Sequence, residues 1–174
     1  LILVQKSLGS SPSRPTKKDM PVLLSLFSYQ KLSCLSENLF PDKDANWVAY
    51  KGKHMEFILD LGEVMSIRSV EMDFLNVQAQ ANWHQLILPK FVTYSTSQDG
   101  ESYSKPTQID NPNNPNPAEN PEIVKLPFLE FKSGFKDTKA RYIKVHAESV
   151  LKMPNWHINA GKPAILYTDE IVVK

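Results

Sequence analysis

Apolar and polar residues alternate with a period of two through most of the chain that follows Val22. Three runs show this most clearly, and the residues on their apolar faces are Phe57, Leu59 and Leu61; Val70, Met72 and Phe74; and Ile143, Val145 and Ala147. Successive side chains of a β-strand point to opposite faces, so each run predicts an antiparallel strand with one buried and one wet side. No stretch has the spacing of an amphipathic helix.

Turn-forming residues divide these runs. Gly62 is expected to end the first strand. Asp99-Gly100 predicts a hairpin between strands at 90–97 and 101–105, because glycine accepts a positive φ at little cost. The proline-rich segment 109–122 predicts a surface loop, since proline cannot donate to a sheet ladder. Six or more short strands with long loops predict an all-β fold, an antiparallel β-sandwich or barrel.

The length fits one domain, since 174 residues can build one core but are few for two. Residues 1–20 are rich in Ser, Pro and Lys and predict a linker or the end of a preceding domain, which leaves 21–174 as the folded domain. The first residue is not Met and the apolar start is too short for a signal peptide. We therefore expect a fragment of a larger protein.

Composition and charge exclude several classes of protein. The formal net charge is +1, from 20 basic and 19 acidic residues, so the broad positive surface of a nucleic-acid-binding protein is missing. No apolar run is long enough for a transmembrane segment. The single cysteine, Cys34, excludes an internal disulfide and argues against a cysteine-based zinc site.

The tryptophans share a local pattern. Each follows an asparagine in a segment between predicted strands, and the three segments are Asn46–Trp47, Asn82–Trp83–His84 and Asn155–Trp156–His157. An indole ring can stack on the apolar face of a sugar, and neighbouring Asn and His can bond its hydroxyls. The alternative is that each Trp closes one end of the sandwich, because Trp is highly buried on average.

The alternating direction of consecutive strands places two of these segments at the same end. If consecutive strands run antiparallel, the residues before Phe57 and the loop 76–89 lie at one end of the sandwich, so Trp47 and Trp83 share that end. Gly62 and the Asp99-Gly100 hairpin then lie at the other end. The loop 149–163 cannot be placed in this way, and our hypothesis is that Trp156 lies at the same end as Trp83.

Catalysis has little support. The chain lacks the nucleophile, zinc-protease, phosphate-loop and EF-hand motifs, and the spacing of its carboxylates nominates no pair for sugar hydrolysis. Its histidines, His54, His84, His146 and His157, lack metal-ligand spacing, and His146 is expected to be a solvated residue on an outward strand face. The chain is therefore predicted not to be an enzyme.

Calcium is the metal that the sequence favours most. The segment 40–46 offers Asp42, Asp44 and backbone carbonyls, the hard oxygen ligands that Ca²⁺ prefers. An ordinary polar turn is the alternative, because such acidic turns are common in loops.

Four segments together resemble the discoidin or coagulation factor V/VIII C-type family. They are NWVAYKGKHMEFILDLGE from Asn46, ILPKFVTYSTSQDGESY from Ile87, KARYIKVHAES from Lys139 and PNWHINAGKPAILYTDEIVV from Pro154. Within this family, the segments most resemble the galactose-binding-like variant appended to hexosaminidase-like glycosidases of gut Bacteroidetes.

The resemblance implies a jelly roll of about eight strands without activity of its own, in an extracellular, periplasmic or cell-surface protein. It also implies a loop end that binds glycans of the galactose or N-acetylhexosamine type, and a structural Ca²⁺ held by the region 37–44 and by Glu170. Where relatives have Leu-x-Asp-Gly before the first Trp, this chain has Leu35-Ser36-Glu37-Asn38, without the glycine.

The sequence leaves three functions open. The first is a non-catalytic carbohydrate-binding accessory module that uses Trp83, His84, Trp156 and His157 and holds other domains of its parent chain near glycan. The second is a structural spacer or interaction domain without a small ligand. The third is a small hydrolase, for which no residues are nominated.

Overall fold

The computed structural model describes residues 2–5, 22–25, 48–76, 85–112 and 128–174, and in these ranges the protein is all-β. The strands are β1 (Ile2–Gln5), β2 (Val22–Ser25), β3 (Val48–Lys51), β4 (Met55–Leu75), β5 (Phe91–Ser97), β6 (Thr107–Asp110), β7 (Phe128–Glu148) and β8 (Ile165–Val173). The described residues include no helix long and apolar enough to cross a membrane.

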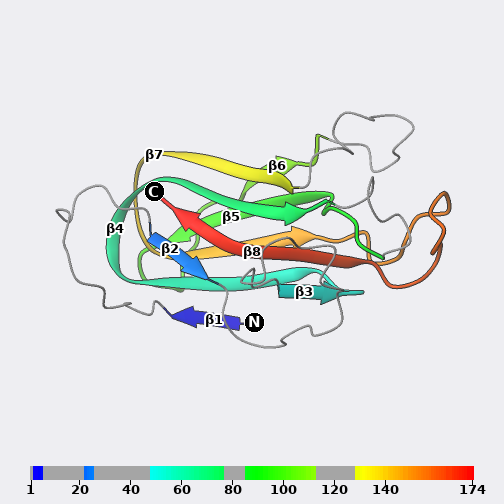
Figure 1. Cartoon of the computed structure of the whole chain (residues 1–174). Helices are drawn as coiled ribbons and strands as arrows, with labels where there is room; N and C mark the ends of the chain where they lie inside the picture. The colour runs from blue at the N-terminus through cyan, green and yellow to red at the C-terminus, as the bar shows by residue number, and fades with distance from the viewer. Residues whose placement is uncertain (1, 6–21, 26–47, 77–84, 113–127) are drawn as a thin grey trace, which may run out of the picture.

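Two strands of 21 residues, β4 and β7, pair antiparallel over nearly their whole length and bend together (Figure 1). The pairing shifts register between Asp60 and Met65 and again between Ile67 and Ser69. The first half of β4 and the second half of β7 form the first layer with β1, β5 and β6. The other halves form the second layer with β8, on which β2 and β3 pair. The antiparallel β-sandwich expected from the sequence is therefore confirmed, with one parallel pair, β1 and β4.

The expectation that Gly62 ends a strand is wrong, because β4 continues through it. Gly62 has a φ of 86°, and its backbone N–H donates to Asp60 Oδ1 at 2.8 Å. A left-handed glycine here bends the strand from one layer into the other, which period-two alternation cannot distinguish from a turn.

The predicted inward faces are correct. The apolar residues of all three alternating runs are at most 2% exposed, and they fill one core between the layers. The second run differs on its outer side, where Ser69 and Glu71 are each only 8% exposed. Glu71 is covered by ion pairs with Lys132 and Lys174, so this side is less wet than the alternation predicts.

The Asp99-Gly100 hairpin joins β5 to β6 as expected, but its second strand begins later than predicted. Asp99 Oδ1 accepts the backbone N–H groups of Glu101 and Ser102, each at 2.9 Å, which holds residues after the turn out of the ladder. The segment 101–105 is therefore no strand, and β6 starts at Thr107, directly after Pro106.

Part of the segment expected to be a linker or the end of a preceding domain forms a strand in the structure. Ile2–Gln5 pairs with Phe57–Asp60 on the edge of the first layer. The domain boundary at residue 20 stays a prediction.

Candidate functional site

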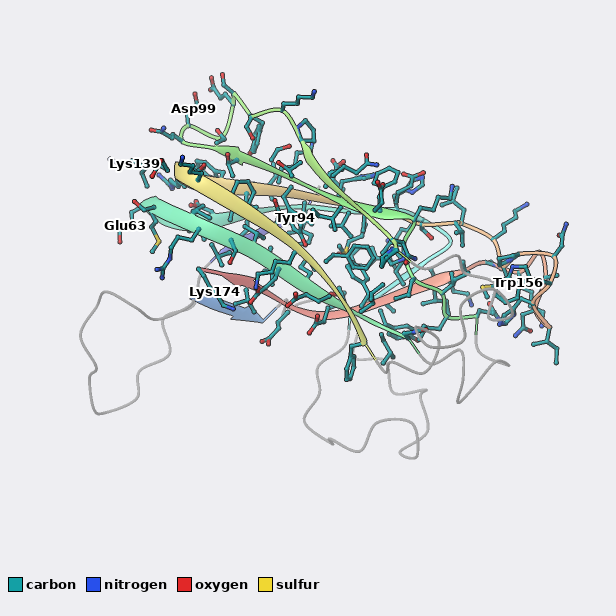
Figure 2. All side chains as sticks on the ribbon, turned by 90° about the horizontal axis from the view of Figure 1, so that it is seen from above. Glu63, Tyr94, Asp99, Lys139, Trp156 and Lys174 are labelled. Atoms are coloured by element: carbon teal, nitrogen blue, oxygen red, sulfur yellow. The ribbon has the colours of Figure 1, made fainter. Side chains whose placement is uncertain are left out.

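One end of the sandwich gathers the start of β4, the residues before β5 and the loop 149–164 (Figure 2). The backbone of Ile87 donates to the Ile165 carbonyl at 3.1 Å, and Ile165 in turn donates to Gln85 at 2.7 Å. Lys90 donates to the Glu148 carbonyl at 2.8 Å. Figure 2 shows Trp156 at this end, and Glu63, Asp99 and Lys139 at the opposite one.

The loop that carries Trp156 is held by its own backbone. Met153 donates to Lys162 at 2.8 Å and accepts from Gly161 at 3.0 Å, so the loop doubles back on itself. The Met153 side chain is 2% exposed and packs with Ile87 and Ala164 in a small apolar cluster. These contacts fix the base of the loop to the segment that follows residue 84.

The two predicted site residues of this loop differ in exposure. Trp156 is 41% exposed, and its ring lies edge-on to the His157 ring with centroids 5.6 Å apart. His157 is only 7% exposed, and its Nδ1 accepts the Asn159 N–H at 3.0 Å. Burial lowers the pKa of His157, so its ring is neutral at neutral pH and supports the loop under the indole.

The remaining predicted site residues divide between the described and undescribed parts of the chain. Trp47, Asn82, Trp83 and His84, and the calcium candidates Asp42 and Asp44, lie outside the described residues. Glu170 is half-buried on β8, opposite Ser25 of β2. The described residues 85–90 lie at the end that holds Trp156. The hypothesis that Trp83 shares this end stays a prediction.

Carboxyl groups with a shifted pKa serve as ion-pair or turn partners. Arg141 binds Asp60 through two nitrogens, at 2.9 and 3.0 Å, and this bond is the main cause that lowers the pKa of Asp60. Burial would raise the pKa of Glu71, but its bonds to Lys132 and Lys174 lower it overall. Such groups stay ionised, whereas the general acid of a glycosidase needs a raised pKa.

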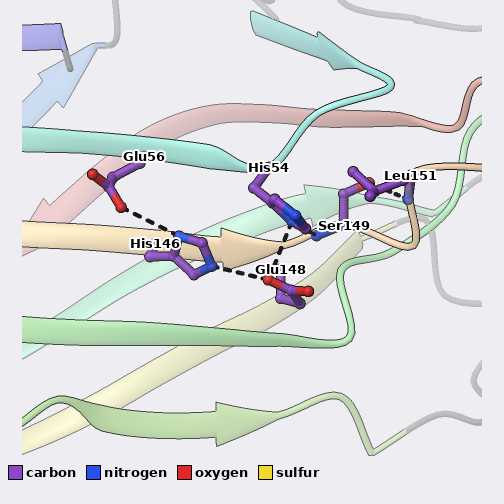
Figure 3. Close-up of polar contacts among 6 residues, drawn as sticks. All are labelled: His54, Glu56, His146, Glu148, Ser149 and Leu151. Atoms are coloured by element: carbon purple, nitrogen blue, oxygen red, sulfur yellow. Dashed lines mark hydrogen bonds and ion pairs between the residues drawn. The ribbon is translucent and has the colours of Figure 1, made fainter.

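Sequence reasoning missed one polar cluster at this end, formed by His54, His146 and Glu148 (Figure 3). His146 was expected to be solvated, but it is 27% exposed in its side chain and contacts both Glu148 and Glu56. The period of two already places residues 146 and 148 on one face, whereas His54 joins them only through the register of β4 against β7.

No protein-family model and no curated protein matches the chain. Among solved structures, it is similar to the C-terminal domain of a chitobiase from Bacteroides fragilis, with 19% identity and a TM-score of 0.38, over 70% of this chain and 66% of that domain. A fragment of a putative chitobiase from Bacteroides thetaiotaomicron gives 18% identity and a TM-score of 0.44, over 70% of this chain and 60% of that fragment.

A CBM32 module from Clostridium perfringens, solved in complex with GalNAc-β-1,3-galactose, gives 13% identity and a TM-score of 0.44, over 86% of this chain and 94% of that module. These are the kinds of domain that the sequence resembles. The match spans about two thirds or less of the two chitobiase structures. With such TM-scores the similarity carries no inference about the ligand, which has to come from the chain's own residues.

Proposed function

We propose that this chain is a non-catalytic carbohydrate-binding module that presents Trp156 as a stacking platform for a sugar ring. The observation that carries the proposal is the exposure of this indole, 41%, on a loop held by its own backbone bonds. An exposed tryptophan on a fixed loop loses little conformational entropy when it stacks on a ligand, which favours binding at a shallow site.

Polar groups beside the indole suit the hydroxyls of a sugar. Asn155 is exposed next to Trp156, and the Lys162 ammonium, also exposed, lies 2.9 Å from Asn159 Oδ1. The predicted partners Asn82, Trp83 and His84 precede a segment at this same end, and they complete the proposed site. The predicted Ca²⁺ site and a role beside a catalytic domain of a secreted glycoside-processing protein belong to the same proposal.

Titration of the chain with galactose, N-acetylgalactosamine and N-acetylglucosamine tests it, with binding followed by calorimetry and by NMR shifts of the tryptophan indoles. Trp156→Ala is expected to abolish binding, whereas Trp156→Phe keeps part of it because a smaller ring still stacks. Val64→Ala is the matched control, since Val64 is also an exposed apolar residue, at 49%, and directly follows Glu63, which lies at the opposite end. Sugar binding that survives Trp156→Ala would remove this assignment.

A second candidate function is docking onto a neighbouring domain of a longer chain. Ile158 is 74% exposed two residues after the indole, and an aliphatic side chain has no stacking role on a sugar. If none of the three sugars binds, and Ile158→Ala raises solubility without other effects, the spacer or interaction role becomes the better description of this end.

A further inference from the structure

We propose that His54, His146 and Glu148 form a binding site for a divalent transition-metal ion, with Zn²⁺ the best match. Glu148 Oε2 lies 3.1 Å from His54 Nδ1 and 3.1 Å from His146 Nε2. One ligand atom from each residue lies within 4.8 Å of the others, and the three side chains are 26–37% exposed. Figure 3 shows both imidazoles directed toward the same carboxylate.

The backbone presets this arrangement. His146 and Glu148 are two residues apart on β7 and so share one face of the first layer. His54 directly precedes Met55, which pairs with Ala147 between the other two ligands. On its other edge this part of β7 pairs with β5, from Phe91↔Glu148 onward. His146 and Glu148 therefore stand on a strand that is paired on both edges, and they lose little entropy when they bind an ion.

The hydrogen bonds of His54 leave one contact unexplained. Its Nδ1 accepts the Ser149 N–H at 3.2 Å, so this nitrogen presents a lone pair and not a proton. The same nitrogen lies 3.1 Å from a carboxylate oxygen, which is also an acceptor. A cation between the two makes this contact favourable, and it would replace the Ser149 bond, whose length is at the upper limit for such bonds.

The second imidazole has the surroundings of a metal ligand. His146 Nδ1 lies 3.5 Å from Glu56 Oε2, while Nε2 faces Glu148. Metal-bound histidines commonly give their other ring N–H to a carboxylate, which fixes the tautomer and directs the free lone pair at the ion. Glu56 is itself within 3.7 Å of the Lys144 ammonium, which limits the negative charge around the site.

The donor set selects the class of metal. Two imidazoles and one carboxylate suit Zn²⁺ and its neighbours, whereas Ca²⁺ and Mg²⁺ take oxygen ligands. Tetrahedral Zn²⁺ with bonds of 2.0–2.1 Å separates its ligand atoms by about 3.3 Å, close to the 3.1 Å of both nitrogen–oxygen pairs. The partial exposure of all three side chains leaves the fourth position to water. None of its three ligands is among the residues predicted for calcium, which are Asp42, Asp44 and Glu170.

Calorimetric titration of the metal-stripped chain with ZnCl₂ at pH 7.5 is the first test, with CaCl₂ and MgCl₂ as comparison ions. One Zn²⁺ per chain is expected, and neither Ca²⁺ nor Mg²⁺ should compete with it, because any Ca²⁺ held at the predicted calcium site uses other residues. Glu56→Gln should weaken Zn²⁺ affinity by about tenfold, as loss of an outer carboxylate does, and Glu148→Gln should weaken it further. Glu63→Gln, which removes an exposed carboxylate at the opposite end, should leave it unchanged.

The ring nitrogens supply a second test that needs no variant. On addition of Zn²⁺, the ¹⁵N signals of His54 Nδ1 and His146 Nε2 should shift, while those of His84 and His157 stay in place. The proposal is overturned if Zn²⁺ does not bind, if affinity is unchanged in Glu148→Gln, or if the shifts fall on His84 or His157. None of these outcomes depends on whether the chain binds sugar.

Discussion

The hydroxyl of Tyr94 joins the two layers of the sandwich across the core, and its removal tests how the layers are held together. Tyr94 is fully buried on β5 in the first layer. Its hydroxyl donates to the carbonyl of Phe131 at 2.6 Å, in the half of β7 that belongs to the second layer. Tyr94→Phe keeps the ring and removes only this bond.

The expected cost follows from the burial of both partners. A buried carbonyl that loses its donor costs about 1–3 kcal/mol, so we expect a loss of about 2 kcal/mol, which lowers Tm by about 4–8 °C for a domain of this size. Urea unfolding followed by tryptophan fluorescence measures the change in the free energy of unfolding. An unchanged slope with urea concentration would show that the variant still unfolds from the same compact state.

Tyr103→Phe is the matched control, because it removes the same group from a different environment. The Tyr103 hydroxyl is buried and has no hydrogen-bond partner among the described residues. Its removal is therefore expected to leave stability unchanged or to raise it. Equal losses in both variants would refute the reasoning, since the effect would then belong to the phenol itself and not to the bond between layers.

The stabilities of wild type and Tyr94→Phe are also expected to diverge at alkaline pH. Burial, with Asp73, Glu130 and Glu71 adding to it, raises the pKa of the Tyr94 hydroxyl. The folded state therefore keeps the proton longer than the unfolded state, whose pKa is near 10. This stabilisation is complete below pH 10 and falls as the pH rises further, so wild type should lose stability there faster than Tyr94→Phe.

Two further predictions concern the loops at opposite ends. Because burial lowers the pKa of His157, its contribution to stability is complete above pH 6.5 and falls as the pH drops through that unfolded value. In urea unfolding measured as a function of pH, His157→Gln should lack this loss of stability below pH 6.5. Gly161→Ala should cost about 1–2 kcal/mol from its positive φ alone. Gly100→Ala should cost more, because a Cβ there would lie 3.1 Å from the Tyr142 ring, and equal costs in a denaturant series would contradict this.

The alternation predicted which residues face the core because it depends only on the strand period. Phe57, Val70 and Val145 were assigned to the inside from sequence and are at most 1% exposed. The same signal could not show that β4 and β7 each run through both layers, since a glycine such as Gly62 can either end a strand or bend it. The short strand β1 has no alternation with polar residues and was missed for that reason.

For the candidate sites too, the sequence predicted features of single segments but not contacts between residues far apart in the chain. Trp156 was expected in a loop because the strand pattern stops before it, and the structure exposes it there. The burial of His157 under that indole depends on how the loop folds back through Met153 and Lys162, which residue types alone do not reveal. Convergence of His54 with His146 needs the register of two strands far apart in the sequence, so spacing along the chain could not find it.

The two proposed sites share a structural base. Ser149 is the first residue after β7, and its backbone N–H bonds to His54 Nδ1, the atom proposed to bind the metal. The Ser149 hydroxyl then accepts the N–H of Leu151, which has a positive φ of 65° and starts the loop toward Trp156. An ion on His54 would therefore act on the first turn of the loop that carries the indole. Since the rest of that loop is fixed by its own backbone bonds, the structural effect of the metal is confined to this base.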